Sequence, residues 1–120
     1  MDITLSINPD TRQAQVIVTG ELDIATAPEL RRELTAAVTV YEEIAVDLGG
    51  LEFCDCSGIG ALIAADNLAR SFGHRLQLCR VPDHLRRLLR ISRHRLTLAD
   101  PSRPVRRPVS LLGAAGRSAA

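Results

Sequence analysis

The chain has 120 residues, enough for one domain with a hydrophobic core that needs no disulfide or metal staples. Its apolar fraction of 46% and charged fraction of 24% are close to globular averages, which excludes a wholly disordered protein. No apolar run approaches the roughly 18 residues of a membrane span, and the first residues show no signal-peptide pattern. Three cysteines do not make a disulfide framework, so we expect a cytoplasmic protein without membrane contact.

The net charge of +1 conceals an acidic half and a basic half. Residues 1–66 carry 12 acidic side chains and 3 arginines, whereas residues 67–120 carry 12 arginines and 2 acidic side chains. Such a basic region is either a solvated face, whose arginine stems cover apolar surface, or a polyanion-binding site whose affinity falls steeply with salt. With only three aromatic residues to stack on bases, we expect no direct nucleic-acid binding. The basic region consists of the tail arginines together with Arg86, Arg87, Arg90, Arg93 and Arg95.

The first 40 residues predict a β-hairpin and a helix. Apolar and polar residues alternate over 3–7 and over 13–20, with a turn signal at 8–10 between them. Thr26 then precedes Glu29 at the spacing of a capping box. Apolar residues recur at helical spacing after it, so we place a helix at about 27–40.

A buried strand and a second helix are predicted next. The apolar run 44–48 is typical of a strand covered on both faces, and we expect Gly49 and Gly50 to end it. We place Ser57 as the N-cap of a helix that runs to about Phe72. The remaining predicted elements are a strand at 76–81, a helix that starts at 82–83 and a short strand at 96–98.

This order predicts an α/β fold: a single domain with a mixed sheet of four to five strands and about three to four helices packed on it. We assign residues 1–100 to the domain. Residues 101–120, rich in proline, arginine and alanine, have little apolar surface to bury and are expected to form a mostly disordered tail.

The stretch from 46 to 60 holds the densest chemical signal. Ser57 is either a structural N-cap or a phosphoacceptor, because a phosphate there would meet unpaired N–H groups and the positive end of a helix dipole. Cys54 and Cys56 lack the spacing and further ligands of a zinc site, so we interpret them as small buried residues and expect no metal. No nucleophile–base pair and no phosphate-cradling loop can be assembled, so we expect neither an enzyme nor a cofactor.

The second helix carries two isoleucines on an unexpected side. At about 100° per residue, Ile59 and Ile63 fall among polar residues. They form either a partner-docking surface beside Ser57 or a patch that a neighbouring loop covers. The polar side contains Asp66, Asn67 and Arg70, and the expected core side contains Ala61, Leu62, Ala65, Leu68, Ala69 and Phe72.

Two motifs resemble a known family. Residues 20–27 read Gly-Glu-Leu-Asp-x-x-Thr-Ala, and residues 46–60 read Val-Asp-Leu-x-x-Leu-x-Phe-x-Asp-x-Ser-Gly-Ile-Gly. With the segments 87–91 and 96–98, they resemble the STAS domain over about residues 3–100, and more narrowly the bacterial anti-sigma factor antagonists. The chain departs from that pattern at Cys56, where serine is common, at Cys54, where a larger apolar residue is common, and at Gly49.

The resemblance implies a regulatory switch. The serine at position 57 would be phosphorylated by the anti-sigma factor, itself an ATP-dependent serine kinase. The unmodified antagonist would bind that kinase and free a sigma factor, phosphorylation would release the antagonist, and a phosphatase would reset it. The candidate partner-binding residues around Ser57 are Asp23, Asp55, Cys56, Gly58, Ile59 and Ile63.

A second interpretation remains open. The chain could be a STAS subunit that is not phosphorylated and acts as a scaffold in a transporter or another complex, because an N-cap position also selects serine. The sequence leaves a monomer and a weak dimer equally open.

Overall fold

The computed structural model describes residues 1–8, 10, 13–91 and 96–98. The connection at 92–95 and the tail expected at 101–120 lie outside these residues. Within them, the α/β fold class is confirmed, with a five-stranded mixed sheet and three helices. The elements are β1 (Asp2–Asn8), β2 (Gln13–Leu22), α1 (Ala27–Val40), β3 (Glu43–Cys54), α2 (Cys56–Ser71), β4 (Arg75–Cys79), α3 (Asp83–Ile91) and β5 (Thr97–Leu98).

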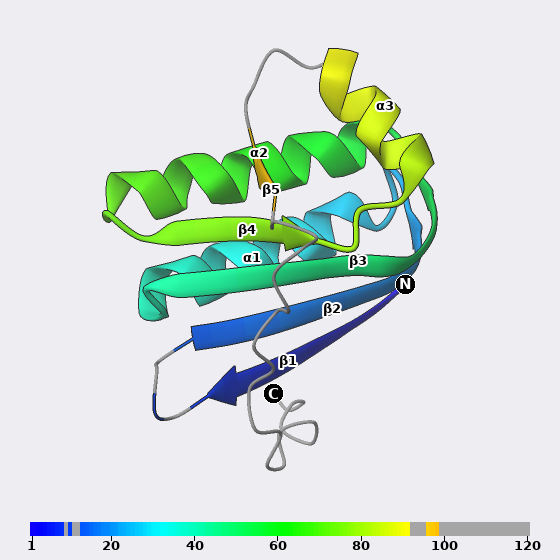
Figure 1. Ribbon diagram of the computed structural model, residues 1–120. Coiled ribbons are helices and arrows are strands. Elements are labelled where there is room, and N and C mark those ends of the chain that lie inside the picture. The colour runs from blue at the N-terminus through cyan, green and yellow to red at the C-terminus, as the bar shows by residue number, and fades with distance from the viewer. Residues whose placement is uncertain (9, 11–12, 92–95, 99–120) are drawn as a thin grey trace.

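The strands lie in the sheet in the order in which they occur in the chain. β1 pairs antiparallel with β2, and β2 to β5 are parallel (Figure 1). Each helix therefore joins two neighbouring parallel strands, and each crossover moves in the same direction along the sheet. Because such crossovers are right-handed, all three helices belong on one face of the sheet.

The hydrophobic core lies between this sheet face and the helices. Val16, Val46 and Leu78 are register partners across β2, β3 and β4, and each is at most 2% exposed. Fully buried leucines of α1 and α2 belong to the same cluster, and each stabilises the fold by roughly 1.5–3 kcal/mol relative to an exposed side chain. No helix among the described residues is long and apolar enough to cross a membrane.

The expected end of the third strand at Gly49 and Gly50 is wrong. β3 continues to Cys54, and Gly50 pairs with Thr19 of β2 between two register shifts. A Cβ atom on Gly50 would lie 2.6 Å from the Thr19 Cγ2 atom, so the glycine permits a close approach of the two strands. The glycines therefore bend the strand without ending it, and this extension carries β3 as far as the start of α2.

An ion pair between the buried Asp47 carboxylate and the exposed Arg80 side chain explains the other glycine. The Arg80 Nε atom donates to both carboxylate oxygens of Asp47, at 3.0 and 3.1 Å, and this bonding raises the pKa of the Arg80 guanidinium. A Cβ atom on Gly49 would lie 2.8 Å from the Arg80 Cζ atom. Glycine at position 49 thus leaves space for the arginine to reach the carboxylate.

Candidate functional site

Two aspartates lie side by side where β2 and β3 end. Leu22 and Cys54 are register partners, so the next residues, Asp23 and Asp55, leave the sheet on adjacent strands, which lie about 4.8 Å apart. The Asp55 N–H donates to the Leu22 carbonyl oxygen at 3.1 Å and continues the pairing by one residue. The sequence motifs at 20–27 and 46–60 therefore converge on one edge of the sheet.

Asp55, and not Ser57, is the N-cap of α2, so the expected N-cap is wrong. One Asp55 carboxylate oxygen accepts from the Ser57 N–H at 2.9 Å and from the Gly58 N–H at 3.4 Å. The N–H groups predicted to receive a phosphate are thus already bonded to a carboxylate. Ser57 is half-buried in the first turn, and its hydroxyl makes no hydrogen bond within the described part of the chain.

The loop between β2 and α1 is fastened by Asp23 and Thr26. The Asp23 carboxylate accepts from the N–H groups of Ala25 and Thr26 at 2.9 and 3.1 Å. The Thr26 hydroxyl donates to the Glu21 carbonyl oxygen at 3.0 Å and accepts from the Asp23 N–H at 3.0 Å. The predicted capping box is wrong, because this hydroxyl closes the loop and bonds no N–H of the helix.

This fastened loop presents Ile24 to solvent beside the serine. Ile24 is 77% exposed and lies at the mouth of the pocket that Ser57 also lines. Sequence analysis missed it, because Ile24 belongs to no periodic pattern. Its position inside the Gly-Glu-Leu-Asp-x-x-Thr-Ala motif at 20–27 was the one available signal.

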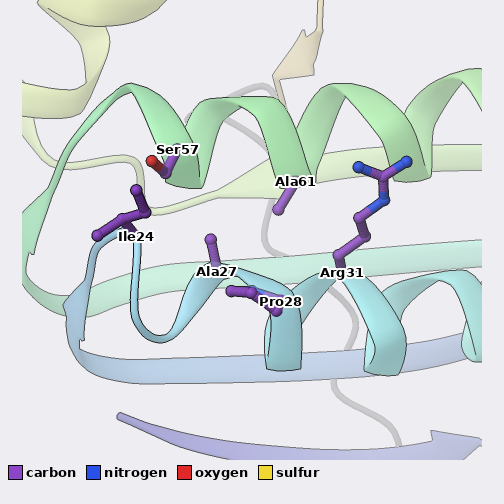
Figure 2. Close-up of a pocket in the computed structure, with 6 residues that line it drawn as sticks. All are labelled: Ile24, Ala27, Pro28, Arg31, Ser57 and Ala61. Atoms are coloured by element: carbon purple, nitrogen blue, oxygen red, sulfur yellow. The ribbon is translucent and has the colours of Figure 1, made fainter.

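An open pocket of about 280 Å³ lies between the first turns of α1 and α2. Ile24 and Ser57 line one end of it, and Arg31 of α1 extends toward α2 at the other (Figure 2). Its apolar walls are Ala27, Pro28 and Ala61. The pocket thus combines apolar walls, one cationic side chain and the hydroxyl of Ser57, the candidate phosphoacceptor.

Two glycines of α2 lie in opposite surroundings. A Cβ atom on Gly58 would lie 2.6 Å from Leu22 and 2.7 Å from the Cys54 sulfur, so the start of α2 packs directly on the ends of β2 and β3. A Cβ atom on Gly60 would meet nothing within 4 Å, and this residue faces solvent. Gly58 therefore allows α2 to pack closely on β2 and β3, whereas Gly60 lies on open surface one turn from Ser57.

The predicted isoleucine surface is wrong for Ile59. Ile59 is only 6% exposed and belongs to the core, and Ile63 is half-buried against that core. Because α2 contacts α1 and α3 as well as the sheet, its buried arc is wider than the single stripe assumed from the sequence. For the same reason Asp66, expected on the polar side, is 2% exposed and pairs with Arg70 at 3.0 Å. The expected core position of Phe72 is wrong, because this residue is the C-cap beyond the last turn of α2 and is 51% exposed.

The two cysteines flanking Asp55 also differ. Cys54 is buried as expected, and burial together with the charge of Asp55 raises the pKa of its thiol to about 12. Cys56 is exposed, so its predicted burial is wrong. Both are free thiols, and no three metal-ligating side chains gather anywhere in the described ranges.

Known proteins with similar sequences identify the family of this chain. The family model described as "Mlab, STAS domain" matches residues 6–94. An anti-sigma-B factor antagonist of Listeria monocytogenes is 30% identical over 98 residues, which cover 77% of this chain and 82% of the relative. The chain belongs to the STAS family of anti-sigma factor antagonists. The anti-sigma-B factor antagonist of Bacillus subtilis is 25% identical to this STAS domain over 92 residues, covering 77% and 84% of the two chains.

Solved structures share the STAS fold. The anti-sigma factor antagonist SpoIIAA in its unphosphorylated form matches with a TM-score of 0.67 and 18% identity, over 82% of this chain and 88% of that one. The phosphorylated form of SpoIIAA from Bacillus matches with a TM-score of 0.66 and 18% identity, over 84% of this chain and 94% of that one. An anti-sigma factor antagonist from Mycobacterium paratuberculosis matches with a TM-score of 0.60 and 23% identity, over 75% of this chain and 77% of that one.

The two glycines of α2 give a matched pair of substitutions. Gly58→Ala should destabilise the domain by about 1–3 kcal/mol, because its methyl group would displace the Leu22 side chain. Gly60→Ala should stabilise it by about 0.5–1 kcal/mol, because alanine favours an open helical position. Urea denaturation measures both free energies of unfolding. Equal effects of the two substitutions would contradict the packing described for Gly58.

Thiol labelling tests the environments of the cysteines. In the native protein near pH 8, an alkylating reagent should modify one thiol rapidly, and peptide mapping should locate it at Cys56. Cys54 and Cys79 should react only after unfolding, because burial raises the pKa of both thiols. Rapid labelling of Cys54 in the folded state would show that α2 does not pack on β3 as described.

Proposed function

We propose that this STAS domain is an anti-sigma factor antagonist whose partner is an anti-sigma factor serine kinase, and that phosphorylation of Ser57 switches the interaction. With Ser57 unmodified, the domain binds the kinase and frees a sigma factor in the cytoplasm. The Ser57 oxygen then attacks the γ-phosphorus of ATP held by the kinase, ADP leaves, and the hydroxyl proton passes to a base of the kinase. A phosphatase hydrolyses the phosphoserine and restores the binding form. The domain acts by binding and is not itself an enzyme.

The environment of the Ser57 hydroxyl carries this proposal. A phosphoacceptor needs an accessible oxygen whose modification leaves the fold intact. Ser57 is half-buried at the edge of an open pocket, and its side chain makes no hydrogen bond in the part of the chain that the structure describes. Because Asp55 caps the helix, helix capping does not account for a serine at position 57.

The surface around Ser57 suits a protein partner. Ile24 supplies an exposed apolar side chain on a loop held by five hydrogen bonds of the Asp23 and Thr26 side chains, so little conformational entropy is lost when a partner covers it. The pocket next to it offers apolar walls and a rim with a single cation. An apolar side chain held in place in this way can anchor a partner that covers it.

Phosphorylation would change this surface mainly through charge. A phosphate adds roughly −1.5 to −2 charges at neutral pH, beside the carboxylates of Asp23 and Asp55. A partner surface matched to a neutral serine would then face a bulky dianion. A loss of about 3–4 kcal/mol in binding free energy corresponds to a roughly 100- to 1000-fold weaker complex, which is enough for a switch.

Substitution of Ser57 tests the phosphoacceptor. Incubation with the candidate anti-sigma factor kinase and ATP should raise the intact mass of the wild type by one phosphoryl group, and Ser57→Ala should abolish the increase. The free energy of unfolding should change by less than about 0.5 kcal/mol, because Asp55 provides the cap. Ser71→Ala, at the exposed far end of α2, is the matched control and should be labelled like the wild type.

A wild type that stays unmodified while it still binds a protein partner would favour the non-phosphorylated scaffold instead. Full labelling of Ser57→Ala would move the phosphoacceptor elsewhere in the chain.

Substitution of Ile24 tests the docking surface. Ile24→Asp should weaken the complex with the kinase by about 30-fold or more, the effect of losing a hot spot worth about 2 kcal/mol. Val40→Asp is the matched control, since Val40 is 59% exposed at the opposite end of α1, about 20 Å away along the helix. Titration calorimetry gives both affinities, and thermal unfolding checks that both variants stay folded. Similar affinities for the two variants would rule out Ile24 as an anchor.

A further inference from the structure

The phosphorylated form of the domain poses an electrostatic problem. The first-turn N–H groups of Ser57 and Gly58 donate to the Asp55 carboxylate, so they are not available to a phosphate on the serine. The Gly58 and Ile59 N–H groups also donate to the Asp55 carbonyl oxygen, at 3.1 and 3.3 Å. A phosphoryl group on Ser57 therefore lies next to a fixed negative charge, and a cation from another element would offset the repulsion.

The pocket at Ser57 contains one such cation. Arg31 is the only charged residue among the residues that line it, and it reaches from α1 toward α2 (Figure 2). No carboxylate within residues 1–8, 10, 13–91 and 96–98 forms an ion pair with Arg31. Its side chain is exposed and points toward α2 beyond Ala61, so the guanidinium has to turn along the pocket to reach Ser57 (Figure 2). No ion pair within the described residues opposes that turn.

We propose that Arg31 binds the phosphoryl group of phosphorylated Ser57, so that α1 supplies an intramolecular anion site for a modification carried by α2. This inference rests on the proposed function in that it assigns a ligand to the same pocket. A guanidinium presents paired N–H donors that match two phosphate oxygens, which a point charge does not. The ion pair bridges the two helices across the pocket.

The site has a consequence for partner release. A phosphoserine joined to Arg31 occupies the pocket between Ile24 and Ala61, and an incoming apolar side chain finds it filled. The pairing also consumes the one cation that an acidic residue of the partner could have used. Release then follows from an occupied pocket as well as from charge repulsion.

The experiment compares proteins that carry phosphoserine at position 57 by genetic encoding, independent of any kinase. Phosphorus NMR follows the second ionisation of the phosphoserine, whose ordinary pKa is about 6. A bound guanidinium stabilises the dianion, so the phosphate pKa should be lower in the otherwise wild-type protein than in Arg31→Gln by about half a pH unit or more. Arg32→Gln is the matched control, because Arg32 is an exposed neighbour on α1 that does not line the pocket.

The same phosphate pKa in all three proteins would overturn the proposal, as would equal shifts in Arg31→Gln and Arg32→Gln, which would indicate a general charge effect. Because the phosphoserine is encoded, these outcomes do not depend on whether a kinase modifies Ser57. A failed kinase assay with a lowered phosphate pKa would overturn the proposed function and leave the Arg31 site standing.

Discussion

A single carboxylate, that of Asp55, joins the sheet to the start of α2. The backbone N–H of Asp55 extends the pairing of β2 and β3 by donating to the Leu22 carbonyl oxygen. The Asp55 carboxylate accepts from the N–H groups of Ser57 and Gly58. An N-cap of this kind contributes about 1 kcal/mol, and here it also sets the direction in which the helix leaves the strand. The position of the Ser57 hydroxyl at the pocket rim depends on this geometry. Gly58 completes it, because only a residue without a Cβ atom fits against Leu22 and Cys54.

Much of the fold could be predicted from the sequence, because it depends on periodic patterns. Alternation over 3–7 and 13–20 and helical spacing over 27–40 correspond closely to β1, β2 and α1. The end of β3 could not be predicted in this way. Glycine weakens the interior of a strand, and only the neighbouring Thr19 and Arg80 side chains show why Gly49 and Gly50 are accommodated within this one.

The site was harder to predict, for two physical reasons. Serine and aspartate are about equally good N-caps, so the choice between Ser57 and Asp55 depended on the length of β3 and not on propensity. The burial of Ile59 depended on helices packed beside α2, which a single-helix periodicity does not report. Ile24 lies in a loop, where no pattern distinguishes an exposed apolar residue from a buried one. The partner-binding roles assigned to Asp23, Asp55 and Cys56 remain predictions.

The two loop aspartates limit how such a switch can work. Each is already an acceptor for two backbone N–H groups, so neither carboxylate can rotate away from a new negative charge without uncapping a helix or opening the loop. A phosphate on Ser57 therefore adds to fixed charges, and a cation that can move toward it lowers the electrostatic cost. Arg31 is such a cation because it is long, exposed and free of an ion pair within the described residues. The charge on the serine would then act on the partner through the pocket, while the hydrogen bonds that hold the surrounding loops stay in place.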